Sequence, residues 1–113
     1  MAEHISYDEE NDILAVHKGF SSDERFKGNI DAGDLILDVS TKGRVRGIEI
    51  LNATKFFKEF GIGKEMLENI EHAHFNANLK PDCIILGIVI KAKNVEKEMP
   101  AKVAVPLEVA VCC

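Results

Sequence analysis

Two histidines stand two positions apart in the stretch EHAHFNANL, residues 71–79. On a β-strand, alternate side chains point to the same side about 6–7 Å apart, so the imidazoles of His72 and His74 could share one metal ion. Zn²⁺ needs a third and usually a fourth ligand, and the sequence places none beside the pair. The alternative is the solvent-facing side of an ordinary strand, which the adjacent Asn76 and Asn78 favour. A metal or anion site at His72 and His74 is thus one of two hypotheses.

Acidic side chains gather in DEEND at residues 8–12 and in DAGD at residues 31–34. Both stretches have the composition of turns, in which Asp and Asn side chains bond to their own backbone. Neither has the spacing of an EF-hand loop, which alternates oxygen ligands and ends in a bidentate Glu. We interpret both as turns rather than as cation sites.

Glu49 lies within the apolar string GIEIL at residues 47–51. If it pointed into the protein, its carboxylate would need a partner such as an arginine or a backbone N–H group. Strand alternation instead turns it outward, opposite Ile48 and Ile50, and we favour that orientation.

The sequence carries no signature of a catalytic site. The glycines of GIGK at residues 61–64 are too close together for a P-loop, and no dinucleotide-binding fingerprint is present. With one Tyr, no Trp and four His in 113 residues, a binding or assembly module is favoured over an enzyme with a deep pocket. Because catalytic triads assemble in space, enzymatic activity stays open.

The net charge of −5 disfavours direct binding of nucleic acid, because most of the surface would repel phosphate groups. Lys42, Arg44 and Arg46 could form a local basic patch, although turn composition favours a solvated hairpin tip. The apolar run CIILGIVI at residues 83–90 is far shorter than the ~20 residues that cross a bilayer. The first residues lack the features of a signal sequence. We expect a cytoplasmic protein with no membrane contact.

The three cysteines form no CxxC motif, so neither a zinc knuckle nor a disulfide framework is indicated. Cys83 lies in the apolar run and is expected in the core, since free Cys behaves as a small apolar residue. Cys112 and Cys113 are adjacent in the last residues of the sequence.

The hydrophobic pattern predicts two hairpins in the first half of the chain. Residues 5–7 and 12–18 form the first around an acidic turn, and residues 34–51 form the second with Gly43 in its turn. Residues 19–33 have the composition of a loop with at most one irregular edge strand.

A helix is expected after the second hairpin. NATKFFKEFG, residues 52–61, has three Phe at helical spacing, Asn52 or Thr54 as candidate N-cap, and Gly61 where the helix would end. Residues 64–70 can extend or repeat this helix.

The remaining sequence predicts three strands. The first covers residues 71–79, with Ala73, Phe75, Ala77 and Leu79 on one face. The run at residues 83–90 is apolar on both faces, which implies cover on both sides by a helix or by another subunit. Residues 101–111 alternate strictly, with Val103, Val105, Leu107, Val109 and Val111 on one face. Pro106 places this last strand at a sheet edge or at a bulge.

Residues 1–113 are expected to form a single domain, because no linker or internal repeat divides them. Antiparallel hairpins in series with one helical insertion predict an α+β fold, with one antiparallel sheet and one or two short helices packed on it.

Three stretches in the first half carry a family resemblance: YDEENDIL at residues 7–14, DLILDVS at residues 34–40 and above all GRVRGIEILNA at residues 43–53. They resemble the pattern of the domain of unknown function 2283, a family of small bacterial and archaeal proteins. The matching positions are Tyr7, Asp8, Asp12, Leu14, Asp34, Gly43, Gly47, Ile48, Glu49, Ile50, Leu51, Asn52 and Ala53. The resemblance covers about residues 5–60. It implies a small β-rich fold with a helix after GIEIL, and it implies no known activity, because the family has no assigned catalytic residues.

Taken together, the sequence predicts a non-enzymatic module that self-associates as a homo-oligomer or binds a protein partner, with a regulatory role as one option. The strand that is apolar on both faces and the Val-rich edge strand leave more apolar surface than a small helix pair can cover. The alternative is a metal- or small-ligand-binding protein, or an enzyme, centred on His72 and His74. Apart from that metal, no cofactor is expected.

Overall fold

Strands in two antiparallel sheets make up most of the chain. The structure is a computed structural model that describes residues 4–96 and 98–106. Within these residues, a five-stranded sheet has the order β1-β2-β5-β4-β3 and a three-stranded sheet has the order β6-β7-β8. The strands are β1 (His4–Asp8), β2 (Ile13–His17), β3 (Phe26–Ala32), β4 (Leu35–Ser40), β5 (Val45–Leu51), β6 (Ile70–Leu79), β7 (Cys83–Ala92) and β8 (Met99–Pro106).

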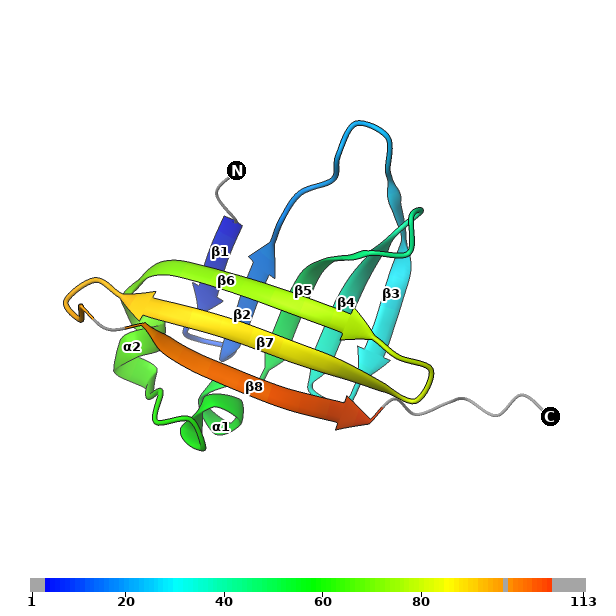
Figure 1. Ribbon diagram of the computed structural model, residues 1–113. Helices are drawn as coiled ribbons and strands as arrows, with labels where there is room; N and C mark the ends of the chain where they lie inside the picture. The colour runs from blue at the N-terminus through cyan, green and yellow to red at the C-terminus, as the bar shows by residue number, and fades with distance from the viewer. Residues whose placement is uncertain (1–3, 97, 107–113) are drawn as a thin grey trace.

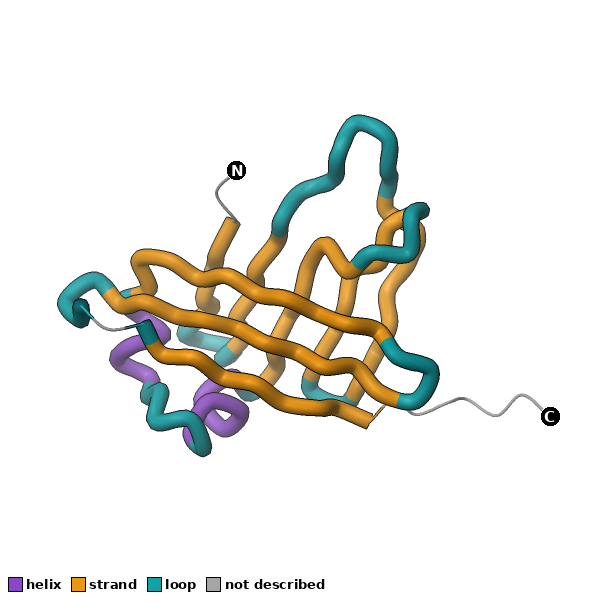
Figure 2. Tube along the Cα trace, in the orientation of Figure 1, coloured by secondary structure: helices purple, strands orange, loops and turns teal. Residues whose placement is uncertain are grey.

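The two sheets stack face to face around one core, and the long strands of the three-stranded sheet cross those of the five-stranded sheet (Figures 1 and 2). The core is formed by alternate residues of both sheets, including Leu14, Val16, Leu37, Ile48 and Ile50 on one side and Phe75, Ile84, Leu86, Ile88 and Ile90 on the other. The expected antiparallel hairpins and short helices are present, but the prediction of one sheet is wrong. A second sheet forms because β6, β7 and β8 each bury one face against the first.

Both predicted hairpins are present. β1 pairs with β2, which places Tyr7 opposite Leu14. β4 pairs with β5 around a turn in which Gly43 adopts a φ of 74°, a conformation that glycine reaches without steric cost. β5 also pairs with β2, and this pairing joins the two hairpins into one sheet.

The segment between the hairpins contains the edge strand β3, whose register shifts between Phe26 and Gly28. An irregular edge strand is what the sequence allowed over residues 19–33. Because β2 and β3 are not neighbours in the sheet, residues 18–25 must cross from one strand to the other. This loop passes the turn between β4 and β5 at the same end of the molecule (Figure 2).

Two short helices, α1 (Ala53–Lys58) and α2 (Lys64–Glu68), follow β5. Figure 1 shows them at one margin of the two sheets, near the beginning of β8. Phe57 and Leu67 insert into the core from these helices. Gly61 follows α1 with a φ of 73°, as expected for a residue that ends a helix.

The N-terminus of α1 is capped by a residue from the first hairpin. Asn52 occupies the predicted N-cap position, but it has a left-handed conformation with a φ of 51° and makes no side-chain cap hydrogen bond. The Asp12 carboxylate instead accepts hydrogen bonds from the backbone N–H of Thr54 at 3.1 Å and from the Thr54 hydroxyl at 2.6 Å. The sequence pointed to a local cap, and the side chain that bonds comes from 42 residues away.

The predicted alternation holds along β6 and β8. Ala73 and Phe75 are buried, whereas Leu79 at the end of β6 is 41% exposed. Val103 is half-buried against the core, and Pro106 is the last residue of an edge strand. The expected inward positions Leu107, Val109 and Val111 lie outside the described residues, as do Cys112 and Cys113.

β7 is buried on one face only. Its inward residues Ile84, Leu86, Ile88 and Ile90 are in the core, whereas Cys83, Ile85 and Val89 are half-buried on the outer face. Figure 1 shows none of the described helices or strands over that face, so no helix within residues 4–96 and 98–106 covers it. Cover by another subunit stays a prediction. The prediction of Cys83 in the core is also wrong, because its position in the pleat directs it outward.

Candidate functional site

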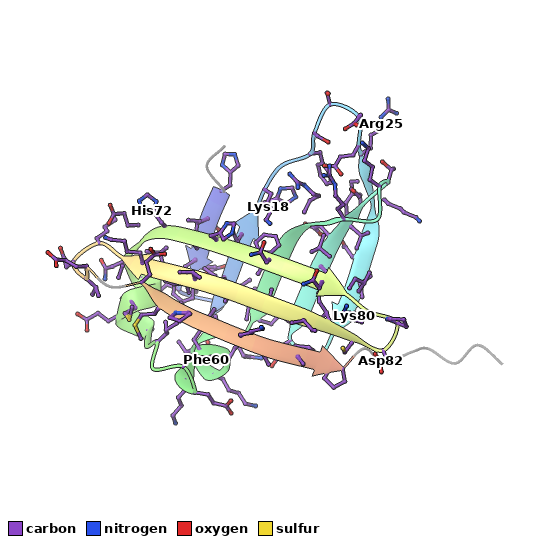
Figure 3. The ribbon with its side chains drawn as sticks, in the orientation of Figure 1. Lys18, Arg25, Phe60, His72, Lys80 and Asp82 are labelled. Carbon is purple, nitrogen blue, oxygen red and sulfur yellow. The ribbon has the colours of Figure 1, made fainter. Side chains whose placement is uncertain are left out.

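His72 and His74 lie on the outer side of β6, as the strand pattern predicted. The His72 side chain is 75% exposed and points away from the body of the protein (Figure 3), and its Nε2 lies 3.7 Å from a carboxylate oxygen of Glu71. Across residues 4–96 and 98–106, no group of three or more His, Cys, Asp or Glu side chains could hold a metal ion. A metal site at His72 and His74 therefore remains a prediction, and these residues supply no third ligand for it.

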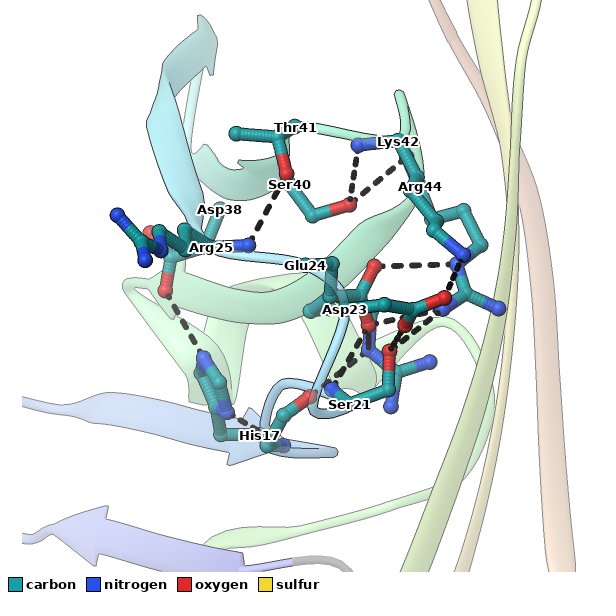
Figure 4. Close-up of polar contacts among 12 residues, drawn as sticks. His17, Ser21, Asp23, Glu24, Arg25, Asp38, Ser40, Thr41, Lys42 and Arg44 are labelled. Carbon is teal, nitrogen blue, oxygen red and sulfur yellow. Dashed lines mark hydrogen bonds and ion pairs between the residues drawn. The ribbon is translucent and has the colours of Figure 1, made fainter.

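A buried carboxylate organises the loop that crosses from β2 to β3. The Glu24 side chain has 0% exposed surface and accepts a hydrogen bond from the backbone N–H of Ser21 at 3.1 Å. Arg44 of the β4–β5 hairpin contacts the Glu24 carboxylate through two nitrogens: Nη2 lies 2.9 Å from Oε1, and Nε lies 3.2 Å from Oε2. Figure 4 shows these side chains converging on Glu24 from the loop and the hairpin. A two-point arginine–carboxylate contact of this kind fixes both side chains.

A second arginine and an exposed ion pair complete the cluster. Arg46 Nε lies 3.3 Å from Glu24 Oε1 and donates a hydrogen bond to the carbonyl oxygen of Gly19 at 2.8 Å. At the tip of the hairpin, Lys42 pairs with Asp23, and both side chains are largely exposed. Two sets of charged contacts thus join the loop to the β4–β5 hairpin. The ion pairs of Glu24 are buried, and the pair of Lys42 with Asp23 is exposed to solvent.

The hydrogen bonds of Glu24 determine its charge. Burial by itself would raise the pKa of Glu24, because a charge is less stable away from water. The Ser21 N–H, the Ser40 hydroxyl and the Arg44 guanidinium outweigh burial and lower the pKa to about 2. Glu24 is therefore ionised at neutral pH and balances one of its two arginines.

A groove of about 500 Å³ lies beside this cluster, between the β4–β5 hairpin and the free edge of β6. We call it the basic groove; it is lined by Lys18, Gly43, Arg44, Val45, Arg46, Asn76, Ala77, Asn78 and Leu79. Lys18 follows β2 and lies near β6 (Figure 3), with its Nζ 4.4 Å from the centroid of the buried Phe75 ring. The described lining contains three cationic side chains and no acidic one.

The sequence anticipated this site only in part. Lys42 is the solvated hairpin tip that turn composition favoured, but Arg44 and Arg46 hold a buried carboxylate and line a groove. Glu24 and Lys18 were not recognised as site residues. The stretch SSDERF has ordinary loop composition, so nothing local distinguishes a buried Glu24 from the exposed Asp23 beside it.

A histidine and an aspartate meet on the outer face of the five-stranded sheet. His17 Nε2 lies 3.7 Å from Asp38 Oδ2, and Nδ1 accepts a hydrogen bond from the backbone N–H of Gly19 at 2.7 Å. Gly47 lies between them, and a Cβ atom there would be 2.7 Å from Asp38 Oδ2. The glycine leaves room for the pair, and the pair in turn orders the start of the crossing loop.

The residues that match the family pattern mainly stabilise the fold. Tyr7 donates a hydrogen bond to Asp12 at 2.7 Å, and the Ala53 backbone N–H donates to the Asp12 carbonyl oxygen at 2.9 Å. The Leu51 N–H donates to the carbonyl oxygen of Asp34 at 2.7 Å. Glu49 is exposed, as predicted. None of the three cations of the basic groove belongs to that pattern.

The outer face of the three-stranded sheet carries cross-strand pairs of apolar residues. Ile85 pairs with Ala104, Val89 with Pro100, and Cys83 with Pro106. The β7 members are half-buried and the β8 members are exposed. We call these six residues the outer apolar strip. The strip is interrupted at one pair, in which Lys102 lies opposite Gly87.

This fold defines a class of small proteins with two stacked antiparallel sheets and short helices at their margin. The family model for the protein of unknown function DUF2283 matches residues 4–53. An uncharacterized protein of Methanocaldococcus jannaschii is 34% identical over 96 residues, which cover 84% of this chain and 78% of the relative. The chain belongs to the DUF2283 family, as its first half indicated.

A second relative is a protein of Methanosarcina mazei that its name proposes to be a hypoxanthine phosphoribosyltransferase. It is 33% identical over 66 residues, which are 58% of this chain and 49% of that relative, so the match spans about half of its length. No solved structure matches the chain. Neither described helix is long and apolar enough to span a membrane.

Proposed function

We propose that the protein is a non-enzymatic module that self-associates through the outer apolar strip. The observation that carries this proposal is the series of apolar pairs on a sheet face that the described chain leaves uncovered. Soluble proteins commonly place polar residues on the open face of an antiparallel sheet, so a face that carries a series of apolar pairs is a candidate interaction surface.

The apolar character of the strip favours a second copy of the chain as the partner, because the same strip on that copy would match it. An exposed sheet face can pack on its own copy about a two-fold axis, which is the commonest symmetry of soluble oligomers. Edge-to-edge pairing along β8 is disfavoured, because Pro100 and Pro106 cannot donate hydrogen bonds to an added strand. A different protein partner and a regulatory role are the alternatives within this class.

Native mass spectrometry and light scattering of the wild-type protein and of Val89→Lys test the proposal. The wild type should be a dimer, and Val89→Lys should be a folded monomer, because the substitution places a charge within the strip. Ile36→Lys is the matched control: Ile36 is also half-buried and outward-facing, but on the five-stranded sheet beside Glu49. A monomeric wild type, or equal dissociation by both variants, would contradict the proposal.

The same spectra test the metal hypothesis for His72 and His74. A stoichiometric metal that is lost in the double variant His72→Ala, His74→Ala would support a ligand-binding function instead. The phosphoribosyltransferase activity that one relative's name suggests is not part of this proposal, because the alignment spans only half of that relative. A cytoplasmic location stays a prediction from the sequence.

A further inference from the structure

The imidazole ring of His17 lies between a backbone N–H group and a carboxylate. Its Nδ1 accepts a hydrogen bond from the backbone N–H of Gly19 at 2.7 Å, and its Nε2 lies 3.7 Å from Oδ2 of Asp38 (Figure 4). A ring nitrogen that accepts a hydrogen bond carries no proton, so the proton of the neutral ring is on Nε2, which faces Asp38. The geometry around His17 therefore fits one tautomer of the neutral ring.

Packing fixes the orientation of this ring. The ring lies over Gly47, where a Cβ atom would be 2.4 Å from Cδ2 of His17. Phe20 packs against the ring edge to face, with the two ring centroids 5.2 Å apart. The His17 side chain is nevertheless 32% exposed, so water reaches it. His17 can therefore gain a proton from solvent while its neighbours hold the ring in place.

A proton on Nδ1 would reverse the contact between His17 and Gly19. Histidine is the side chain that ordinarily changes its charge between about pH 5 and 8. A protonated ring donates from both nitrogens, so two N–H groups would then face each other across 2.7 Å. The contact can be kept only if an acceptor takes the place of the Gly19 N–H group.

The peptide group between Lys18 and Gly19 contains such an acceptor, the carbonyl oxygen of Lys18. The peptide groups on either side are held, because the Lys18 N–H donates to the Arg46 carbonyl at 2.7 Å and the Gly19 carbonyl accepts from Arg46 Nε at 2.8 Å. A half-turn of the middle peptide group would carry φ of Gly19 from its present 76° to a negative value, and glycine adopts both with similar ease. This one peptide group can thus turn while the chain on both sides stays in place.

We propose that the Lys18–Gly19 peptide group is a proton-sensitive switch. When His17 is neutral, the N–H of this group donates to Nδ1; when His17 is protonated, the carbonyl of the same group accepts from Nδ1–H. Phe20 follows the switch, packs on His17 and is 36% exposed, so the switch links the proton to the exposed start of the crossing loop. The switch does not involve the outer apolar strip, so either proposal can fail without the other.

Charged and titratable groups face His17 from every neighbouring strand. Asp38 on β4 favours the protonated ring, and so does Glu49 on β5, which lies diagonally across the same sheet face. His4 on β1 is opposite His17 in the strand register, and Arg46 contacts the carbonyl of the next peptide group; the charges of both oppose the proton. The carboxylate in contact with the ring therefore favours the proton that turns the peptide group.

The ammonium group of Lys18 lies away from this face. Its Nζ is 4.4 Å from the centroid of the Phe75 ring, which belongs to the core between the sheets. The switch uses the backbone of Lys18 and not its side chain.

The test is NMR spectroscopy of the full ¹⁵N-labelled chain between pH 8 and pH 5. An N–H···N hydrogen bond produces a scalar coupling between its two nitrogens, here the amide nitrogen of Gly19 and Nδ1 of His17. We expect this coupling at pH 8, with the ring proton on Nε2, and its loss at pH 5. The amide shift of Gly19 and its φ-dependent couplings should change with the same midpoint pH as the His17 ring.

Gly19→Ala changes the balance between the two states in a known direction. Alanine is strained at positive φ, so the variant disfavours the state with neutral His17 and should raise the midpoint pH of the His17 titration by about one unit. Gly33→Ala is the matched control: Gly33 also has a positive φ, of 64°, and at both glycines an added Cβ would meet no atom within 4 Å. Gly33 lies in the β3–β4 turn, so this control should leave the midpoint unchanged.

Four results would overturn the proposal. They are a coupling that persists at pH 5, a proton on Nδ1 at pH 8, loss of the coupling without a change in φ of Gly19, and the same change of midpoint in Gly33→Ala as in Gly19→Ala. Thermal unfolding shows whether each variant is folded. If Gly19→Ala does not fold, the wild-type titration decides alone.

Discussion

At the scale of the residue, Glu24 shows how a single carboxylate can organise a surface. It is excluded from water, yet it is ionised because Ser21, Ser40 and Arg44 surround it with donors. A buried charge without partners would destabilise the protein, and two arginines without the carboxylate would repel each other. The ion pairs of Glu24 with Arg44 and Arg46 therefore hold the crossing loop against the arginines of the basic groove.

This environment predicts an acid dependence of stability. The pKa of Glu24 is about 2 in the folded protein, below the ordinary Glu value of 4.5, so its contribution is fully present above pH 4.5 and is lost as the pH falls toward 2. Glu24→Gln should lower the free energy of unfolding at pH 7. The difference in this free energy between the variant and the wild type should be smaller at pH 3. Denaturant unfolding at both pH values measures this difference.

Other carboxylates, such as Asp12 and Asp23, also have lowered pKa values. Their effect cancels in the difference in free energy of unfolding between the variant and the wild type, because both proteins contain them. Glu49→Gln is the control, because Glu49 is exposed on β5. If Glu24→Gln lowers the free energy of unfolding by the same amount at pH 7 and pH 3, the charge of Glu24 does not stabilise the fold.

At the scale of the element, α1 depends on a residue outside it. A helix of six residues is too short to be stable alone, so its start must be held by tertiary contacts. Asp12 supplies them through Thr54, and the same carboxylate accepts the Tyr7 hydroxyl. Burial and then this bond to Asp12 raise the pKa of Tyr7, which keeps the phenol protonated as a donor. The first hairpin and α1 therefore form one unit.

Asp12→Ala should lower the free energy of unfolding by about 1–3 kcal/mol, from the lost helix cap and from alanine in a left-handed conformation. Asp12 has a φ of 56°, which Asn tolerates better than Ala, so Asp12→Asn should cost less. Glu9→Ala, in the same turn, is the control and should be nearly neutral. Hydrogen exchange of the α1 amides should increase in Asp12→Ala; unchanged exchange would mean that Asp12 does not hold the helix.

At the scale of the whole molecule, the two sheets share one core and should unfold together. Phe75 of β6 is fully buried against residues of the five-stranded sheet and the helices. Phe75→Ala should cost about 3–5 kcal/mol, and the transition should remain a single one by both far-UV circular dichroism and tyrosine fluorescence from Tyr7 on β1. Phe26→Ala, at a side chain that is 52% exposed, should cost less than about 1 kcal/mol. Separate transitions for the two probes would show that the sheets fold as independent units.

The local features of this protein can be predicted from its sequence. Two hairpins, the outward Glu49, the exposed His72 and His74 and the edge position of Pro106 follow from strand alternation and turn chemistry, which involve residues close together in the chain. The family membership also followed from a short string of residues in the first half.

The remaining features depend on contacts between distant parts of the chain. The division into two sheets, the cap that Asp12 provides for α1, and the meeting of Glu24 with Arg44 all join residues that are distant in sequence. The basic groove brings together Lys18 after β2, Arg46 in β5 and Asn76 in β6. No local pattern encodes these contacts, because each depends on which strands pair and on how one sheet packs across the other.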